Sequence, residues 1–438
     1  MNKNTTRTSA INRLVSKITT TTTVLCTTAL MAYSSQSMAA PSLEQEVKIT
    51  DLALHFDGVK KASVTAARND PDAGPGQYDY MYGTSIAPHG DSIKTYQNYV
   101  FMTWYKGGKY NRRVMLTRYN MDTGNSVDIE FPHQHTGFEG RWWVGETHNT
   151  IAVGISPKND TVHLLYDMHA YHSGTDTGGN GSFAKDYFRY SYSVAGAATV
   201  ADSQFTLSKF VKDTSSKSEG SNDYKHLTMT GTENHSAFSK LTYPKFFLND
   251  SGDLFMHMRQ GTSHDGRIVF NKYDGNSKWG NFKSFNSLGA QAKGDTHNWS
   301  IYGVMKYVDG KIRTAFQRRL SNSADKYKYQ NGVYYAYSDN QTGASNWKNH
   351  KGQSLAMPMI DATPSLVMEP GDLVSTTAKN EVNIVGGFDF TVTDNGDEHF
   401  IHQVKDTENN VKVSAHTYRK AGTTNLSLKP VSQAPKYL

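Results

Sequence analysis

The 438-residue chain has one cysteine, Cys26, and no apolar run long enough to cross a membrane. Cys26 lies in an N-terminal segment that we expect to be removed, so the mature protein would have no disulfide and no thiol chemistry. The sequence also lacks a serine nucleophile elbow, a phosphate-binding glycine loop before a helix and a cysteine-based metal site. Any catalysis must therefore use other residue types.

The N-terminus has the pattern of a secretory signal. A short apolar run, Val24 to Ala32, is followed by the small-residue cleavage motif Ser37-Met38-Ala39, and the residues before it are basic: Lys3, Arg7, Arg13 and Lys17. We predict a signal peptide at residues 1–39, one domain at 40–438, and secretion to the extracellular space or the periplasm. Removing the four basic residues lowers the formal net charge from +6 to +2, so the basicity of the precursor does not indicate a nucleic-acid partner.

Helical periodicity is almost absent, and Val, Ile, Tyr, Phe and Thr alternate with polar residues along the chain. A module of a polar turn and two β-runs recurs, with strands that begin near residues 99, 161, 253, 311 and 381. Propeller blades of four strands take roughly 40 to 50 residues each, more with loops. The pattern predicts an all-β, seven-bladed β-propeller. Two β-sandwiches are the alternative, but no linker rich in Pro, Gly or Ser divides the chain.

The stretch from Glu146 to His169 indicates a β-hairpin with a histidine at each end. A turn at Ser156–Asp160 would return the second strand, so that His148 and His169 meet at one edge of the sheet. The spacing of 21 residues between them recurs between His297 and Arg318. We therefore expect several hairpins to present polar side chains in a common register to one surface. Either histidine alone is more often a structural residue.

A tyrosine and an arginine show a second shared spacing. Tyr243 precedes Arg259 by 16 residues, and Tyr302 precedes Arg318 by the same number. A lone tyrosine is usually a core aromatic and a lone arginine a surface ion pair, but the recurrence favours a functional reading.

An acid or base next to a cationic side chain suits abstraction of the proton beside a carboxylate. In a uronic acid residue of a polysaccharide, removal of the C5 proton builds negative charge on the carboxylate, which an arginine fork can stabilise. A histidine or a tyrosine can take the proton, and a second such group can protonate the leaving O4 oxygen. A tyrosine base needs a neighbouring cation that favours the phenolate, and Arg259 is the candidate.

Several short motifs carry a family resemblance. Thr147-His-Asn, Met168-His169, Thr242-Tyr-Pro and Met258-Arg-Gln-Gly, together with BNR-like repeats, resemble the secreted seven-bladed propeller ulvan lyases. The resemblance runs over most of the mature chain. It implies that His148 and His169 form the histidine pair, that Tyr243 is the acid/base tyrosine and that Arg259 neutralises the carboxylate. Whether His148 or Tyr243 is the base differs between branches of that family, so both roles stay open.

Other residues follow from the resemblance and the repeat positions. The expected substrate-binding residues are Asn149, His297, Asn298, Tyr302, Arg318 and Arg319. No cofactor is expected for catalysis. The resemblance implies that some relatives hold a structural zinc partly through cysteine and that some bind calcium. Since the mature chain would have no cysteine, such a zinc site is either absent or made of His and Asp, so we commit to no metal and leave a structural calcium or zinc open.

The expected partner is the anionic polysaccharide ulvan, a sulfated polymer of rhamnose and uronic acid, cleaved by a monomer without nucleic-acid or membrane binding. Alternatives with the same fold are a propeller glycosidase, a rhamnose–glucuronate lyase acting on other polysaccharides, and a carbohydrate-binding propeller without catalysis. A hydrolase normally needs two carboxylates about 5 to 10 Å apart. Glu146 and Glu233 are the acids near the predicted site, and they are weak evidence of such a pair.

Overall fold

The computed structural model describes residues 43, 45–69, 76–87, 90–169, 188–216, 218, 220–235, 241–320, 330–368, 382–383, 388–406, 411–423 and 426–433. By its internal contacts the chain divides into Met1–Lys48 and Ile49–Leu438, and the fold below is that of the second unit. The predicted signal peptide lies outside the described residues. Among the described residues, none of the helices is both long and apolar enough to span a membrane.

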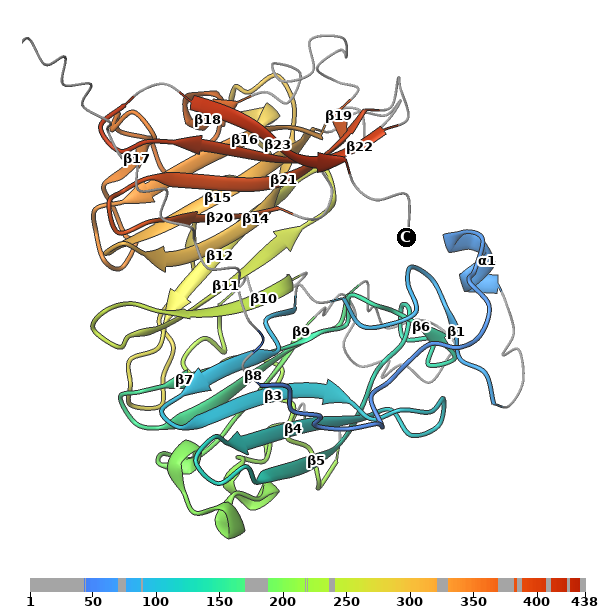
Figure 1. Cartoon of the computed structure of the whole chain (residues 1–438). Coiled ribbons are helices and arrows are strands. Elements are labelled where there is room, and N and C mark those ends of the chain that lie inside the picture. Colours follow the sequence, from blue (N-terminus) through green and yellow to red (C-terminus); the bar gives the residue numbers. More distant parts are fainter. Residues whose placement is uncertain are drawn as a thin grey trace, which may run out of the picture. The chain divides into compact units, whose positions relative to one another are not determined.

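The second unit is built almost entirely from antiparallel β-meanders (Figure 1). The first consists of β2 (Ile93–Tyr96), β3 (Tyr99–Tyr105), β4 (Arg113–Asn120) and β5 (Ser126–Gln134). The second consists of β7 (Ile151–Ser156), β8 (Thr161–Asp167) and β9 (Phe188–Tyr192). The third consists of β10 (Leu241–Leu248), β11 (Leu254–Gly261), β12 (Gly266–Lys272) and β13 (Lys283–Ser284).

Two more meanders follow, and the fourth is joined to the third by one bridge between Gly266 and Ser300. The fourth consists of β14 (Trp299–Val308), β15 (Lys311–Leu320), β16 (Gln330–Ser338), β17 (Trp347–Asn349) and β18 (Leu366–Met368). The fifth consists of β19 (Val382–Asn383), β20 (Asp389–Val392), β21 (Glu398–Asp406), β22 (Val411–Arg419) and β23 (Leu426–Gln433).

The remaining elements are short. A parallel pair joins β1 (Asp79–Tyr80) to β6 (Val144–Gly145). The one α-helix among the described residues is α1 (Val64–Asn69), and the 3-10 turns are η2 (Ala197–Thr199), η3 (Asp202–Gln204), η4 (Leu207–Lys209), η5 (Gln291–Lys293) and η6 (Thr363–Ser365). The all-β prediction is confirmed.

The four largest hydrophobic clusters each lie between two consecutive meanders. One joins the first meander to β7 and β8, the next joins the second meander to the third, and the others join the third to the fourth and the fourth to the fifth. Neighbouring residues on one strand enter different clusters, as Phe255 and Met256 do on β11. Because side chains alternate across a strand, each inner sheet is covered on both faces, which explains why β7 and β8 are buried along their whole length.

This stacking of consecutive sheets is propeller-like. The described residues contain five meanders, and within them no strand pairing closes the fifth meander on the first. The predicted count of seven blades is therefore not confirmed.

Turn lengths set the register of the hairpins. Ser156 pairs with Thr161 across a four-residue turn that ends in Asp160 with φ 53°. Val308 pairs with Lys311 across a two-residue turn, in which Asp309 and Gly310 have φ 48° and 69°. Two positive φ values are typical of the type I′ turn, for which glycine at the second position is favoured.

Candidate active site

The hairpin of β7 and β8 brings His148 and His169 together, as predicted. Ile151 pairs with Tyr166, so the three residues before β7 run alongside the three residues after Tyr166. The two imidazole centroids are 4.6 Å apart. The Tyr82 ring contacts His148 at 4.7 Å between centroids.

A buried glutamate connects the two histidines. Glu146 Oε1 lies 2.5 Å from His148 Nδ1 and accepts the backbone N–H of His148 at 2.9 Å, while Oε2 lies 3.6 Å from His169 Nδ1. Burial by itself would raise the pKa of Glu146, but the hydrogen bonds and charges of His148 and His169 outweigh it and lower the pKa to about 2. An ionised carboxylate only accepts hydrogen bonds, so His148 Nδ1 donates to it, and in the neutral imidazole Nε2 is then the acceptor nitrogen.

Tyr243 stands next to His169 on an irregular part of β10. The pairing of β10 with β11 shifts between Thr242 and Lys245, and Tyr243 itself has φ 57°, which is unusual for a tyrosine. Its backbone N–H donates to Asp167 Oδ2 at 2.7 Å, so the carboxyl group at the end of β8 supports this conformation. The hydroxyl of Tyr243 lies 3.3 Å from His169 Nε2.

The electrostatics of Tyr243 correct one sequence-based expectation. Burial raises the pKa of the Tyr243 hydroxyl well above its ordinary value of 10.0, and the charge of Arg259 lowers it only in part. Arg259 does lie beside the tyrosine, with Cζ 5.8 Å from the ring centroid. The neutral phenol is therefore the stable form at neutral pH, which suits a proton donor better than a base.

Asp167 and His169 are also perturbed by burial. The pKa of Asp167 is raised well above its ordinary value, because burial and the nearby Glu146 charge outweigh the hydrogen bond from Tyr243 and the charge of Arg259. Burial lowers the pKa of His169, against the opposing effect of Glu146. The pair of buried carboxyl groups thus divides into an ionised Glu146 and a neutral Asp167.

Arg259 on β11 is held by partners on three sides. Its Nε donates to Ser300 Oγ at 3.0 Å, Nη1 donates to Thr242 Oγ1 at 3.3 Å, and Nη2 donates to the carbonyl oxygen of Thr262. Its Cζ lies 4.8 Å from the Tyr302 ring centroid. A guanidinium carries five N–H groups, so these three bonds use three of them and leave two that a further acceptor can bind.

Arg319 is a second arginine close to Tyr302. Its Nη1 donates to the Tyr302 hydroxyl at 3.0 Å, and its Cζ lies 4.2 Å from the centre of the same ring. The Tyr302 ring therefore contacts two arginines, Arg259 and Arg319, and both charges add to the positive electrostatic potential around it.

The expected common register of His297 and Arg318 is wrong. The strands β7 and β8, next to which His148 and His169 lie, are joined by a four-residue turn, whereas β14 and β15 are joined by a two-residue turn. As a result, Arg318 pairs with Ile301 instead of facing His297. The partner of Tyr302 is accordingly Arg319 and not Arg318. Because neighbouring residues point to opposite faces of a strand, Arg318 lies on the other face of β15.

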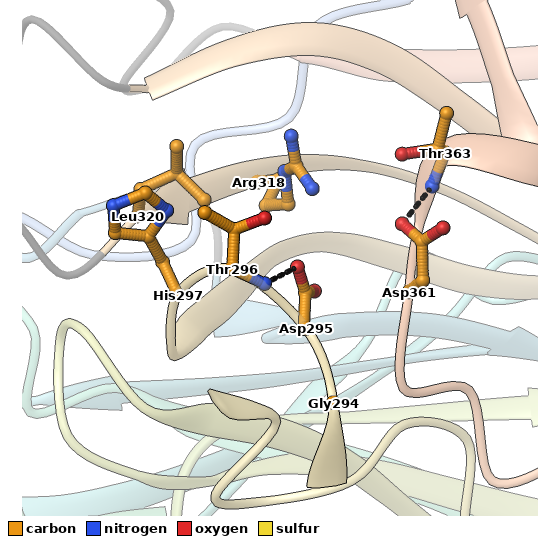
Figure 2. A pocket seen from close by; sticks show the side chains of 8 residues that line it. All are labelled: Gly294, Asp295, Thr296, His297, Arg318, Leu320, Asp361 and Thr363. Carbon is orange, nitrogen blue, oxygen red and sulfur yellow. Dashed lines mark hydrogen bonds between the residues drawn. The ribbon is translucent and has the colours of Figure 1, made fainter. Parts of the chain in front are cut away.

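Arg318 and His297 instead line a separate pocket of about 360 Å³, whose wall comprises Gly294, Asp295, Thr296, His297, Arg318, Leu320, Asp361 and Thr363. Figure 2 shows the Arg318 side chain between Thr296 on one side and Thr363 with Asp361 on the other. Arg318 Nε and Asp295 Oδ2 are buried atoms without a hydrogen-bond partner among the described residues. The role of His297 and Arg318 in substrate binding stays a prediction.

Two asparagines of the predicted set have structural contacts. Asn149 is 1% exposed, and its Nδ2 donates to Thr136 Oγ1 at 2.9 Å and to the Gly137 carbonyl at 3.2 Å. Asn298 Oδ1 accepts the backbone N–H of Gln291 at 2.9 Å. Direct substrate contact by either residue also stays a prediction.

Glu146, Asp167 and Ser300 are the residues that sequence reasoning did not place in the site. Glu146 lies two residues before His148 and was considered only as one half of a hydrolase pair. Asp167, two residues before His169, is fully buried and carried no signal, because a buried acid looks like any other acid in sequence. Ser300 reaches Arg259 only through the pairing of distant strands.

Glu146, His148 and His169 could in principle hold a metal, since one ligand atom from each lies within 4.8 Å of the others. One pair of atoms does not fit a shared ion: the 2.5 Å between Glu146 Oε1 and His148 Nδ1 is a hydrogen-bond distance, whereas two ligands of a tetrahedral zinc would lie about 3.3 Å apart. We therefore assign a hydrogen bond to these two atoms.

Comparisons with known proteins identify relatives over most of the chain. The family model described as "BNR repeat-containing family member" matches residues 99–433. An ulvan lyase, short isoform, from Alteromonas sp. (strain LOR) is 47% identical over 432 residues, which cover 95% of this chain and 81% of that protein. An ulvan lyase, long isoform, from Alteromonas sp. is 51% identical over 407 residues, which cover 92% of this chain.

The crystal structure of polysaccharide lyase Uly1 has 63% sequence identity and a TM-score of 0.83, and the match covers 88% of this chain and 81% of that one. The chain spans only 40% of the length of the long isoform from Alteromonas sp..

Proposed function

Since the chain belongs to the BNR repeat-containing family and, within it, to the ulvan lyases, we propose that it cleaves ulvan by β-elimination at the uronic acid. The new end would carry a uronyl residue with a C4–C5 double bond. The observation that supports this most is the convergence of two histidines and a tyrosine beside a buried arginine, Arg259, that keeps two N–H groups for a ligand.

Arg259 would bind the uronate carboxylate. Its guanidinium is fixed by Ser300, Thr242 and Thr262 before substrate arrives, so little reorganisation is needed when negative charge develops on the carboxylate. Arg319 and Tyr302 lie behind it and add positive charge. This arrangement lowers the barrier to removing the weakly acidic C5 proton.

His148 would remove that proton and Tyr243 would protonate the leaving O4 oxygen. The support for His148 is its Nδ1–H bond to Glu146, which leaves Nε2 as the acceptor. The support for Tyr243 is its raised pKa, which keeps the hydroxyl protonated at neutral pH. His169, with Nε2 3.3 Å from the Tyr243 hydroxyl, would hold the phenol in place. After the product leaves, His148 would release its proton to water and the Tyr243 phenolate would take one up from water.

Hydrolysis is the less favoured reaction. The two acids nearest the cluster, Glu146 and Asp167, are both fully buried, and each already binds a neighbouring group of the site. A glycosidase needs one exposed acid that protonates the bond and a second carboxylate that faces the sugar. A carbohydrate-binding propeller would need neither the Glu146–His148 bond nor the fixed Arg259.

Mass spectrometry of the products tests the reaction class. Elimination gives oligosaccharides with an unsaturated terminal uronate, each lighter by one water than the corresponding hydrolysis product. The proposal predicts that ulvan fragments carry this mass difference and a vinylic H4 proton in the NMR spectrum. Saturated fragments with the full mass would contradict it.

The other features predicted from the sequence belong to the same proposal. The protein would be a seven-bladed propeller, exported after cleavage behind Ala39, and active as a monomer without a catalytic metal or other cofactor. An experimental structure would count the blades, and N-terminal sequencing of the exported protein would locate the cleavage site. Light scattering would give the mass in solution, and dialysis against a chelator should leave turnover unchanged.

A further inference from the structure

A group of aromatic side chains outside the catalytic cluster has the composition of a sugar-binding surface. Tyr110, in the connection from β3 to β4, is 59% exposed, and its ring lies 5.5 Å from that of Trp142. Trp142 in turn lies 5.8 Å from Trp143, and both tryptophans are half-buried in the connection from β5 to β6. We call Tyr110, Trp142 and Trp143 the aromatic platform.

Two buried cations lie against this platform. Lys109 Nζ is 5.9 Å from the Tyr110 ring centroid and 5.8 Å from that of Trp142, and Arg112 Cζ is 5.4 Å from Trp142. Lys109 and Arg112 are only 4% and 6% exposed, so their charge acts from beneath the rings. Such a surface attracts an anionic ligand with an apolar face more strongly than a neutral one.

Arg112 also fixes the platform in place. Its Nη1 donates to the Trp142 carbonyl oxygen at 3.2 Å and to the His135 carbonyl oxygen at 2.5 Å, and Nη2 donates to Gln134 Oε1 at 3.1 Å. The loop that carries the tryptophans is therefore tied to the end of β5. A rigid aromatic surface binds with less loss of side-chain entropy than a mobile one.

Aromatic contacts connect the platform to the catalytic histidine. The Tyr82 ring lies 4.7 Å from His148 and 6.3 Å from Phe138, and Trp143 packs on the small hydrophobic cluster that contains Phe138. Tyr82 is 41% exposed. Phe138 itself is 1% exposed, so this connection runs below the surface, with the exposed rings of Tyr82 at one end and Tyr110 at the other.

We propose that the aromatic platform is a distal subsite for a sulfated rhamnose residue of the same polysaccharide chain. Rhamnose presents a methyl group and C–H bonds that pack on Tyr110 and Trp142, and its sulfate ester complements the charges of Lys109 and Arg112. This subsite rests on the proposed function. It would hold the polymer on the enzyme without taking part in the elimination.

The test compares Tyr110→Ala, and Tyr110→Ala combined with Trp142→Ala, on ulvan and on the shortest oligosaccharide that is cleaved. We expect KM for the polymer to rise about 2- to 10-fold for the single variant and further for the double one, with kcat unchanged. KM for the short substrate should stay the same. The control is Tyr337→Ala, because the Tyr337 ring also lies near two cations. Lys311 Nζ is 4.6 Å and Arg313 Cζ is 5.7 Å from its centroid.

An unchanged KM for the polymer in both platform variants would overturn the proposal. Equal losses on the polymer and the short substrate would overturn it too, because they would show a general effect on folding or catalysis. A KM increase of the same size on desulfated polymer would refute the part assigned to Lys109 and Arg112. Affinity electrophoresis in gels containing ulvan measures binding without turnover, so it reports on Tyr110 even if the polymer is not cleaved.

Discussion

Glu146→Gln separates the positioning of the histidines from substrate contact. The glutamate is fully buried and lies on the far side of both imidazoles from Nε2, so it cannot touch the polymer. A glutamine keeps the shape, and its amide oxygen can still accept the two His148 N–H groups, but it carries no charge. The charge-assisted hydrogen bond to His148 Nδ1 is therefore lost, which makes the opposite nitrogen, Nε2, a weaker base.

The expected loss follows from the bond that is removed. A hydrogen bond to a charged group contributes about 1.5 to 3 kcal/mol, which corresponds to a decrease in kcat of about 10- to 150-fold. KM for ulvan should change little. The substitution also removes the carboxylate that raises the pKa of His169 against the lowering by burial, so the part of the pH–rate profile that comes from His169 should move to lower pH.

Initial rates from ultraviolet absorbance, measured over a range of ulvan concentrations and pH values, give kcat, KM and the profile. Circular dichroism checks the fold of the variant. Glu130→Gln is the matched control, because Glu130 makes an exposed ion pair with Lys106 at 2.9 Å and touches none of the site residues. A kcat within twofold of wild type together with an unmoved pH profile would refute the positioning role of Glu146.

The remaining predictions concern three more variants and the acid unfolding of Glu146→Gln. Arg259→Lys keeps the charge but loses the planar fork, so kcat/KM should fall about 100- to 1,000-fold in initial-rate assays, and near wild-type activity would contradict the carboxylate role. Tyr243→Phe should lower kcat by about 100-fold or more with KM nearly unchanged, and an equal rise in KM would point to binding instead. Asp167→Asn should raise the melting temperature at pH 7 but not near pH 3, because the raised pKa of Asp167 makes the folded state keep a proton that the unfolded chain releases as pH rises; calorimetry at both values checks this. The lowered pKa of Glu146, about 2 against an ordinary 4.5, contributes stability that is present above pH 4.5 and is lost as pH falls towards 2, so Glu146→Gln should flatten the acid unfolding curve in that window.

The sequence predicted the elements that depend on local pattern. Alternating apolar residues and a polar turn were enough to predict the hairpin of β7 and β8, and with it the meeting of His148 and His169. Tyr243 and Arg259 were also placed beside each other correctly, since β10 and β11 are joined by a short connection.

The wrong predictions arose because two hairpins with the same sequence spacing, β7–β8 and β14–β15, have turns of different length. The two-residue turn at Asp309–Gly310 shifts β15 relative to β14, so Arg319 rather than Arg318 reaches Tyr302. A difference of one residue moves a side chain to the other face of a strand, and the turn length was not visible in the spacing alone.

The protonation states could not be predicted from residue types. Arg259 was expected to favour the Tyr243 phenolate, but the burial of the hydroxyl outweighs that charge, and burial depends on how whole sheets stack. The same holds for Glu146 and Asp167, which are both buried but differ in charge because only Glu146 binds the two histidines.

The most direct test of elimination at this site is the ultraviolet absorbance of the C4–C5 unsaturated uronate during incubation of the purified protein with ulvan. The account predicts a steady rise for the wild type that disappears in Arg259→Ala and in His148→Ala, while both variants keep the wild-type circular dichroism spectrum. New reducing ends without this absorbance, or an undiminished rise in Arg259→Ala, would contradict it.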